Sequence, residues 1–252
     1  MCKLCQAIPI QSPAIRTAAV ALIIVLLVVA AASLGKEARL LLTPNAITST
    51  MAVRSAVDGA TYRVHGDLAD PHRAADLLAR LNRRATALVG SLRRRYFGTA
   101  GAPPALPAAA RTPARLACVS NLINRYNPDN FVENSYKDSS GDSSYCIDKG
   151  AILAICLRTR AGAGMRAGQF QDEETLFFVT LHELTHMTIE EVDHPRRFWS
   201  AFRFILEEAE RMPAPFTYRS PDFERHPVSY CGVRVDYNPR YDQGVASIDS
   251  KF

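Results

Sequence analysis

The sequence predicts an α+β fold in which a small sheet packs on one buried helix, behind a single N-terminal transmembrane helix. Three patterns in the 252 residues support this prediction. Residues 172–191 contain no Gly or Pro, and the helix that they predict is apolar nearly all round from Leu176 to Leu184, which is typical of a buried helix. Residues 145–157 run as a short strand, a tight turn and an apolar strand, which indicates a β-hairpin. Residues 17–34 carry no charge, and a run of this length is just long enough to span a bilayer.

The composition suits one globular domain. Hydrophobic residues make up 48% of the chain, which allows a good core, and the net charge of +5 is mildly basic. The chain shows no internal repeat, no Walker motif and no dinucleotide fingerprint, which argues against those nucleotide-binding classes.

The N-terminal region divides into a tail (1–16), a transmembrane anchor (17–34) and a linker (35–60). The charge-free run is longer than the usual core of a signal peptide, so we favour an uncleaved anchor and a single-pass membrane protein. A cleaved secretory signal is the alternative, because Ala30, Ala31 and Ala32 offer a small-residue cleavage site. Basic residues flank the run on both sides too evenly to orient it.

The domain at 61–252 opens with a strand near 62–65 and an amphipathic helix at 71–96, for which Asp70-Pro71 is a good start. The outer face of this helix is rich in arginine: Arg73, Arg80, Arg83, Arg84, Arg93, Arg94 and Arg95. A basic face of this kind could bind anionic lipid or a nucleic acid. The interpretation that we favour is an ordinary solvated helix face.

The rest of the domain alternates loops with shorter elements. Residues 98–113 form a loop rich in Ala, Gly and Pro, and residues 115–126 form a second helix. After Met212, three prolines stop helix formation, and residues 216–250 are irregular with short strands such as 228–235. Four cysteines permit two disulfides, but their redox state stays open: Cys118, Cys146, Cys156 and Cys231.

The pattern His182-Glu183-x-x-His186 lies in the buried helix. Histidines four residues apart stand on the same helix face and can hold one Zn²⁺ together. Glu183, next to the first histidine, can act as general base on a water molecule. Buried polar groups need a partner, and a metal supplies one. The alternative is a histidine pair that only makes hydrogen bonds in the core.

A third ligand is needed, because catalytic zinc usually takes three protein side chains. We predict His194, since Pro195 suits the start of a new helix at 195–211 and the chain can fold back at that point. Glu207 or Glu208 in this next helix is the rival ligand. Glu190 is a poor one, because a straight helix places it a further turn from the histidines.

This pattern, continued by His194-x-x-x-Phe198-Trp199, resembles that of the WLM and SprT-like zinc metallopeptidases. The chain also resembles membrane-anchored metallopeptidases of large DNA viruses of algae and protists, through segments at 127–130, 146–150 and 227–232. It departs from the WLM pattern in two ways. Seven residues separate His186 from His194, where the WLM spacing is usually five, and Asp193 replaces the Gly-Pro before the third histidine.

The resemblance implies a zincin-like peptidase domain whose substrate is a protein or peptide. A strand beside the motif helix would bind the substrate backbone by strand addition, and 151–157 is our candidate, with Ala151, Ile152 and Leu153 in contact. Tyr230 is a candidate substrate contact too. Tyr230, Tyr218 and His226 are alternative candidates for a hydrogen-bond donor to the transition state.

The sequence therefore predicts a membrane-anchored, zinc-dependent peptidase. Two other functions stay open. One is an inert zinc-binding assembly protein, which the intact Glu183 argues against. The other is a WLM-type protease acting on DNA-bound proteins, which the basic helix favours weakly.

Overall fold

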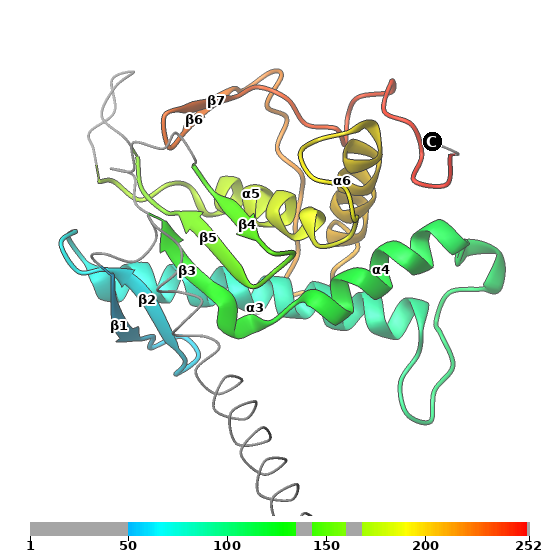
Figure 1. Cartoon of the computed structure of the whole chain (residues 1–252), viewed down its shortest axis with the longest axis horizontal. Helices are drawn as coiled ribbons and strands as arrows, with labels where there is room; N and C mark the ends of the chain where they lie inside the picture. The colour runs from blue at the N-terminus through cyan, green and yellow to red at the C-terminus, as the bar shows by residue number, and fades with distance from the viewer. Residues whose placement is uncertain (1–49, 135–142, 160–167, 251–252) are drawn as a thin grey trace, which may run out of the picture. The chain divides into compact units, whose positions relative to one another are not determined.

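Five strands form one mixed sheet in the computed structural model, which describes residues 50–134, 143–159 and 168–250 (Figure 1). The strands are β1 (Thr50–Arg54), β2 (Thr61–His65), β3 (Phe131–Asn134), β4 (Tyr145–Ile147) and β5 (Ile152–Cys156). Their order across the sheet is β1-β2-β3-β5-β4. The inner strands β2, β3 and β5 are parallel, and the edge strands β1 and β4 run antiparallel to their neighbours. All described residues belong to one compact unit, Asn45–Phe252.

The β4–β5 hairpin forms where the sequence predicts it. All five residues of β5 are buried, as expected for a continuous apolar run inside a sheet. The turn between the strands has positive φ at Asp148, Lys149 and Gly150. Glycine is required at the third position, because a Cβ there would lie 2.7 Å from the carbonyl oxygen of Arg125.

Four helices accompany the sheet: α3 (Pro71–Tyr96), α4 (Pro113–Arg125), α5 (Glu173–His186) and α6 (Arg196–Ala209). Two short 3₁₀ helices cover Ala108–Ala110 and Pro128–Asn130. Helix α3 packs against β1, β2 and β3, and α5 packs against β4 and β5, so both cover the same face of the sheet (Figure 1). Helix α6 packs on α5. The core therefore lies between the sheet and α3, α5 and α6.

The helix predicted at 71–96 is confirmed at both ends, and its buried stripe includes Leu78, Leu81, Leu88 and Leu92. The second helix starts earlier than predicted, because the Thr112 side chain caps it by accepting a hydrogen bond from the Arg115 amide at 3.3 Å. The sheet also starts before the predicted domain boundary at 61. Strand β1 pairs with β2, so residues 50–54 belong to the fold and not to a linker.

The arginine face of α3 is partly used inside the fold. Arg80 and Arg84 each donate to a glutamate of the first turn of α5, at 2.9 Å in both cases. Arg95 makes an ion pair with Glu208 of α6. These pairs hold α3 against the other two helices, while Arg93 and Arg94 stay exposed.

A second hairpin, β6 (Val228–Tyr230) and β7 (Val233–Val235), lies in the C-terminal segment. Its two-residue turn is Cys231-Gly232, both with positive φ, as hairpin turns of the primed types need. A disulfide joins Cys231 to Cys156 at the end of β5. Cys118 and Cys146 are free thiols. The hairpin is thus covalently attached to the end of β5, the strand next to the edge strand β4.

The α+β class is confirmed, but the predicted transmembrane helix is not supported. Residues 17–34, on which that prediction rested, lie outside the described residues. Within the described parts of the chain, no helix is both long enough and apolar enough to cross a bilayer. Helix α3 carries charge along its whole length, and α5, at 14 residues, is about 21 Å long against the roughly 30 Å of a bilayer core. The structure therefore does not support the predicted transmembrane helix or the predicted single-pass membrane location.

Candidate metal centre and its cleft

Helix α5 presents its two histidines on one face. The helix starts at a strong cap, where the Asp172 carboxylate accepts the Thr175 amide at 2.9 Å. Its polar side chains inside the core are satisfied locally: the hydroxyls of Thr180 and Thr185 each donate to the carbonyl four residues earlier, at 2.8 Å. His182 and His186 are partly exposed, which leaves both rings accessible from the cleft side.

His194 folds back onto this pair. Asp193 adopts φ = 60°, a left-handed conformation that turns the chain, and Pro195 then caps α6. As a result, His194 Nε2 lies 2.9 Å from His182 Nε2. One ring nitrogen from each of the three histidines lies within 4.8 Å of the others. The structure therefore brings together the three side chains that the sequence nominated as ligands.

The chemistry of this cluster fits a divalent metal such as zinc. Burial, with the neighbouring imidazoles, lowers the pKa of His182 to about 3, and burial lowers that of His186 to about 4. Burial also lowers the pKa of His194. Neutral imidazoles offer the lone pairs that zinc binds. Nitrogens about 2.1 Å from one ion lie roughly 3 to 4 Å apart, so small side-chain movements close the cluster on one ion.

Phe198, in the first turn of α6, supports all three imidazoles. Its ring centroid lies 4.9 Å from that of His182, 4.5 Å from that of His186 and 4.6 Å from that of His194. Phe198 is fully buried, so the three imidazoles pack against an apolar surface formed by its ring. His194 remains exposed to solvent. An apolar surface of this kind limits water access to one side of a metal.

The rival carboxylate ligands lie elsewhere. Glu207 pairs with Arg203 at 3.3 Å. Glu208 is buried in a network with Arg95, with Arg211 at 2.9 Å and with the Tyr96 hydroxyl at 3.2 Å. Glu190 pairs with Arg125. Each carboxylate already has a cationic partner, and the metal-binding group found among the described residues contains only the three histidines.

Glu183 and Tyr230 share a hollow with His182 and His194. This hollow, of about 390 Å³, is lined by His182, Glu183, His194 and Tyr230 together with residues of α6 and of the β6–β7 hairpin. Glu183 is 4% exposed. Burial holds the pKa of Tyr230 well above its ordinary value and the charge of Glu183 adds to the rise, while the hydrogen bond to Ser144 opposes it. The candidate base and a candidate hydroxyl donor thus border the same space as the ligands.

The predicted substrate strand needs a correction. Strand β5 is not an edge strand, because it pairs with β3 on one side and with β4 on the other. Ile152 and Leu153 are therefore occupied in the ladder, and Ala151 lies in the turn before it. Among the described residues, the edge strand on this side of the sheet is β4. Ser143 and Ser144, just before β4, line the hollow.

Two other donor candidates are not near the site. Tyr218 is buried with its ring against Phe177, at a centroid distance of 5.2 Å, and His226 is exposed. Neither lines the hollow, whereas Tyr230 does. The sequence analysis missed Ser144, Trp199 and Tyr237 as lining residues. The short strand predicted at 228–235 is the β6–β7 hairpin in the structure, and no local signal places that hairpin over α5.

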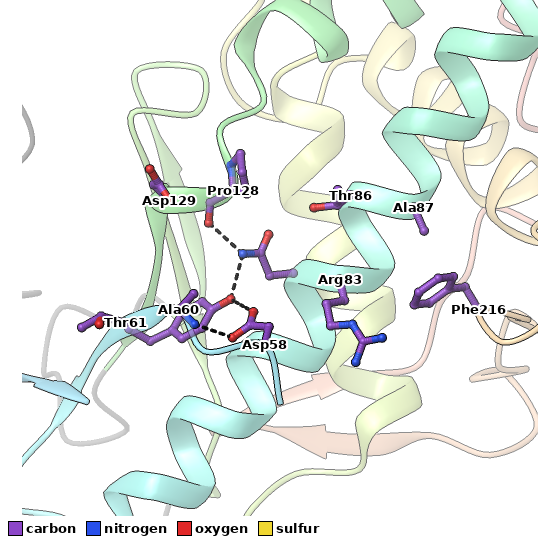
Figure 2. Close-up of a pocket in the computed structure, with 11 residues that line it drawn as sticks. Asp58, Ala60, Thr61, Arg83, Thr86, Ala87, Pro128, Asp129 and Phe216 are labelled. Atoms are coloured by element: carbon purple, nitrogen blue, oxygen red, sulfur yellow. Dashed lines mark hydrogen bonds between the residues drawn. The ribbon is translucent and has the colours of Figure 1, made fainter. Parts of the chain in front are cut away.

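A second hollow, of about 500 Å³, lies between α3, the β1–β2 turn and the 3₁₀ helix Pro128–Asn130 (Figure 2). Its buried polar atoms bond to one another. The Tyr62 hydroxyl donates to Asp58 at 2.7 Å, and the Asn82 amide donates to Tyr62 at 3.0 Å and to the Pro128 carbonyl at 2.8 Å. This network ties α3 to the sheet, so we assign the hollow a structural role.

Two proteins of large DNA viruses are similar to part of this chain. An uncharacterized protein of Acanthamoeba polyphaga mimivirus is 35% identical over 94 residues, which is 37% of this chain and 44% of that protein. An uncharacterized protein of Invertebrate iridescent virus 6 is 29% identical over 76 residues, which is 30% of this chain and 40% of that protein. The chain therefore spans less than half the length of the curated relatives it matches. No family model and no solved structure matches it.

Proposed function

We propose that the protein is a zinc-dependent peptidase. The observation that carries the proposal is that three histidines converge in one cluster, of which His182 and His194 line the same hollow as Glu183. His182, His186 and His194 would hold the ion. Zinc, when bound, supplies a Lewis acid that makes water more acidic and polarises a carbonyl group.

The side chains around the cluster suit peptide hydrolysis. Glu183 would accept the proton of the attacking water and return it to the leaving amine, which is general acid–base catalysis by one carboxylate. Glu183 lines the same hollow as His182 and His194, and its burial, at 4% exposure, keeps it away from bulk solvent. The Tyr230 hydroxyl lies 2.6 Å from Ser144 Oγ. It would donate a hydrogen bond to the developing oxyanion.

Strand β4 offers a place for the substrate backbone. Among the described residues it is one of the two edge strands of the sheet, and it packs against α5, which carries His182 and His186. An extended peptide can add to such an edge through main-chain hydrogen bonds. This arrangement replaces β5, which the sequence nominated, with the neighbouring strand of the same hairpin.

The resemblance to the WLM and SprT-like pattern supports the same proposal. His194 precedes Phe198 by four residues, and Phe198 is the side chain that supports the three imidazoles. The two viral relatives are uncharacterized and do not bear on the reaction. The alternative is an inert zinc-binding assembly protein, which would bind the ion and cleave nothing.

Metal analysis of the purified full-length protein, combined with cleavage of casein and of a peptide library, tests the proposal. We expect one zinc per chain and cleavage that a chelator abolishes. Glu183→Gln should keep the zinc and lose cleavage by at least about 10²-fold, because the change removes only the base. Glu190→Gln is the matched control, since Glu190 is exposed and pairs with Arg125. Zinc binding without cleavage by the unmutated protein would establish the assembly alternative instead.

A further inference from the structure

The hollow beside the histidines has a wall built from two distant parts of the chain. One side comes from Phe178 and Val179 of α5 and from Trp199 and Phe202 of α6. The other side comes from Tyr230, Val233 and Val235 of the β6–β7 hairpin, and from Tyr237. The ring centroids of Trp199 and Tyr237 lie 5.3 Å apart, nearly perpendicular, and connect the two sides.

These walls are apolar, and the charges at their rim cancel. Arg234 and Asp236 both line the hollow, and they pair with each other at 3.0 Å while remaining largely exposed. Glu183 is the remaining carboxylate among the lining residues. The lining therefore offers no unpaired cation to attract an acidic side chain, and its aromatic surface favours an apolar one.

The wall is held in place before any ligand arrives. The Cys156–Cys231 disulfide attaches the hairpin to β5. Ser144 Oγ accepts the Cys156 amide at 3.0 Å and bonds the Tyr230 hydroxyl at 2.6 Å, which ties the hairpin to the segment before β4. A preformed wall lowers the ordering cost of binding.

We propose that this hollow is the specificity pocket of the site, and that it takes a large apolar side chain, of the Phe or Leu class, next to the bond to be cleaved. The inference rests on the proposed peptidase function and adds the substrate class to it. At about 390 Å³, the hollow has room for an aromatic side chain. It adjoins His182, Glu183 and His194, so a side chain in it places the neighbouring peptide bond at the histidines.

The size of the preference follows from the apolar surface that becomes buried. Each additional buried CH₂ contributes about 0.8 kcal/mol, so replacing Ala with Leu in the peptide adds roughly 2.4 kcal/mol at full burial, about 50-fold in affinity. The hollow is open on one side, so we expect a Leu or Phe peptide to bind roughly 10- to 50-fold more tightly than its Ala counterpart.

Binding can be measured apart from cleavage, because the chain has one tryptophan and it lines the hollow. The zinc-loaded Glu183→Gln protein is titrated with a set of peptides that differ at one position, occupied by Phe, Leu, Ala or Asp. Trp199 fluorescence reports occupancy of the hollow. We expect tight binding of the Phe and Leu peptides and weak binding of the Ala and Asp peptides. The unmutated protein is assayed for cleavage of the same set.

A charge placed on the wall should change the preference. Val233 is 45% exposed, so Val233→Lys in the Glu183→Gln background should fold normally. We expect the ratio of Phe-peptide to Asp-peptide affinity to fall at least 10-fold, because the new ammonium attracts the carboxylate. Met51→Lys is the matched control, since Met51 is 46% exposed on β1 and does not line the hollow. Its ratio should stay unchanged.

The outcomes separate the two proposals. Equal binding of the Phe and Ala peptides, or a selectivity ratio in Val233→Lys equal to that in Met51→Lys, overturns the specificity pocket. Equal cleavage of all peptides by the unmutated protein also overturns it, while the peptidase proposal stands. Selective binding without any cleavage leaves the pocket as an apolar peptide site and overturns the peptidase proposal. Absence of both binding and cleavage overturns both.

Discussion

The Nε2 atoms of His182 and His194 lie 2.9 Å apart, although the two are twelve positions apart in sequence. Two imidazole nitrogens at this distance share either the N–H proton of one neutral ring or a cation, because their lone pairs otherwise repel. Burial and the other two imidazoles lower the pKa of His182 to about 3, so its ring is neutral near neutral pH. A shared metal ion, as proposed above, would satisfy both lone pairs.

His194→Ala should therefore lower zinc occupancy sharply, from one ion per chain to a small fraction after dialysis. The two remaining histidines leave the ion with fewer protein ligands than zinc sites in proteins usually have. Inductively coupled plasma mass spectrometry of the folded variant gives the stoichiometry. Glu207→Ala is the matched control and should keep a full zinc ion, because Glu207 pairs with Arg203 on the outer face of α6. Loss of zinc in Glu207→Ala with retention in His194→Ala would reverse the ligand assignment.

The buried Glu133–Arg158 pair yields a prediction about stability. Arg158 Nε lies 2.7 Å from Glu133 Oε1, and the side chains of Glu133 and Arg158 are 0% and 2% exposed. Glu133 also accepts the His65 amide at 2.8 Å, so it joins β2 to β3. Glu133→Ala leaves Arg158 as an uncompensated buried charge and should lower the free energy of unfolding by about 3 to 5 kcal/mol.

Urea denaturation measures this loss, and the Arg80–Glu173 pair provides the comparison. That pair has a similar distance, 2.9 Å, but its side chains are 40% and 38% exposed. Glu173→Ala should cost at most about 1 kcal/mol, because solvent screens exposed pairs. Equal losses in the two variants would show that burial does not control the strength of these pairs. If Glu133→Ala fails to fold, Glu133→Gln should show a smaller loss, since its amide oxygen can still accept from Arg158.

The local parts of this architecture could be predicted from the sequence. The ends of α3, the cap at Asp172, the β4–β5 turn and the helix start at Pro195 all follow from residues that are neighbours in the chain. His194 could be nominated for the same reason, because a proline beside it marks a change of direction. Residues close together in the sequence were therefore sufficient to identify the three histidines as candidate ligands.

The features that could not be predicted depend on pairing between segments that are distant in the sequence. Whether β5 is an edge strand depends on β3, which pairs with it in parallel across a connection that contains β4. No property of residues 151–157 reveals that partner. The hairpin above the cleft is equally non-local, because a disulfide across 75 residues brings it to the end of β5. Trp199 and Tyr237 meet only through this arrangement, so neither could be assigned to the cleft.

The Cys156–Cys231 disulfide gives the last prediction, because it links stability to the shape of the cleft. Closing a loop of 75 residues should stabilise the fold by about 4 kcal/mol, mainly by restricting the unfolded chain. Cys156→Ser should lower the free energy of unfolding by this order, and a reductant should have the same effect on the unmutated protein. Cys146→Ser is the control, since Cys146 is a free thiol, and reductant should not destabilise the Cys156→Ser variant further.

The released hairpin carries Tyr230 and Val233, so Cys156→Ser should also weaken the preference for Phe over Ala peptides at temperatures where it remains folded. Circular dichroism during urea titration measures the first effect, and Trp199 fluorescence in the Glu183→Gln background measures the second. Unchanged stability in both Cys156→Ser and the reduced protein would show that the hairpin is held by its packing and by the Ser144–Tyr230 hydrogen bond rather than by the disulfide.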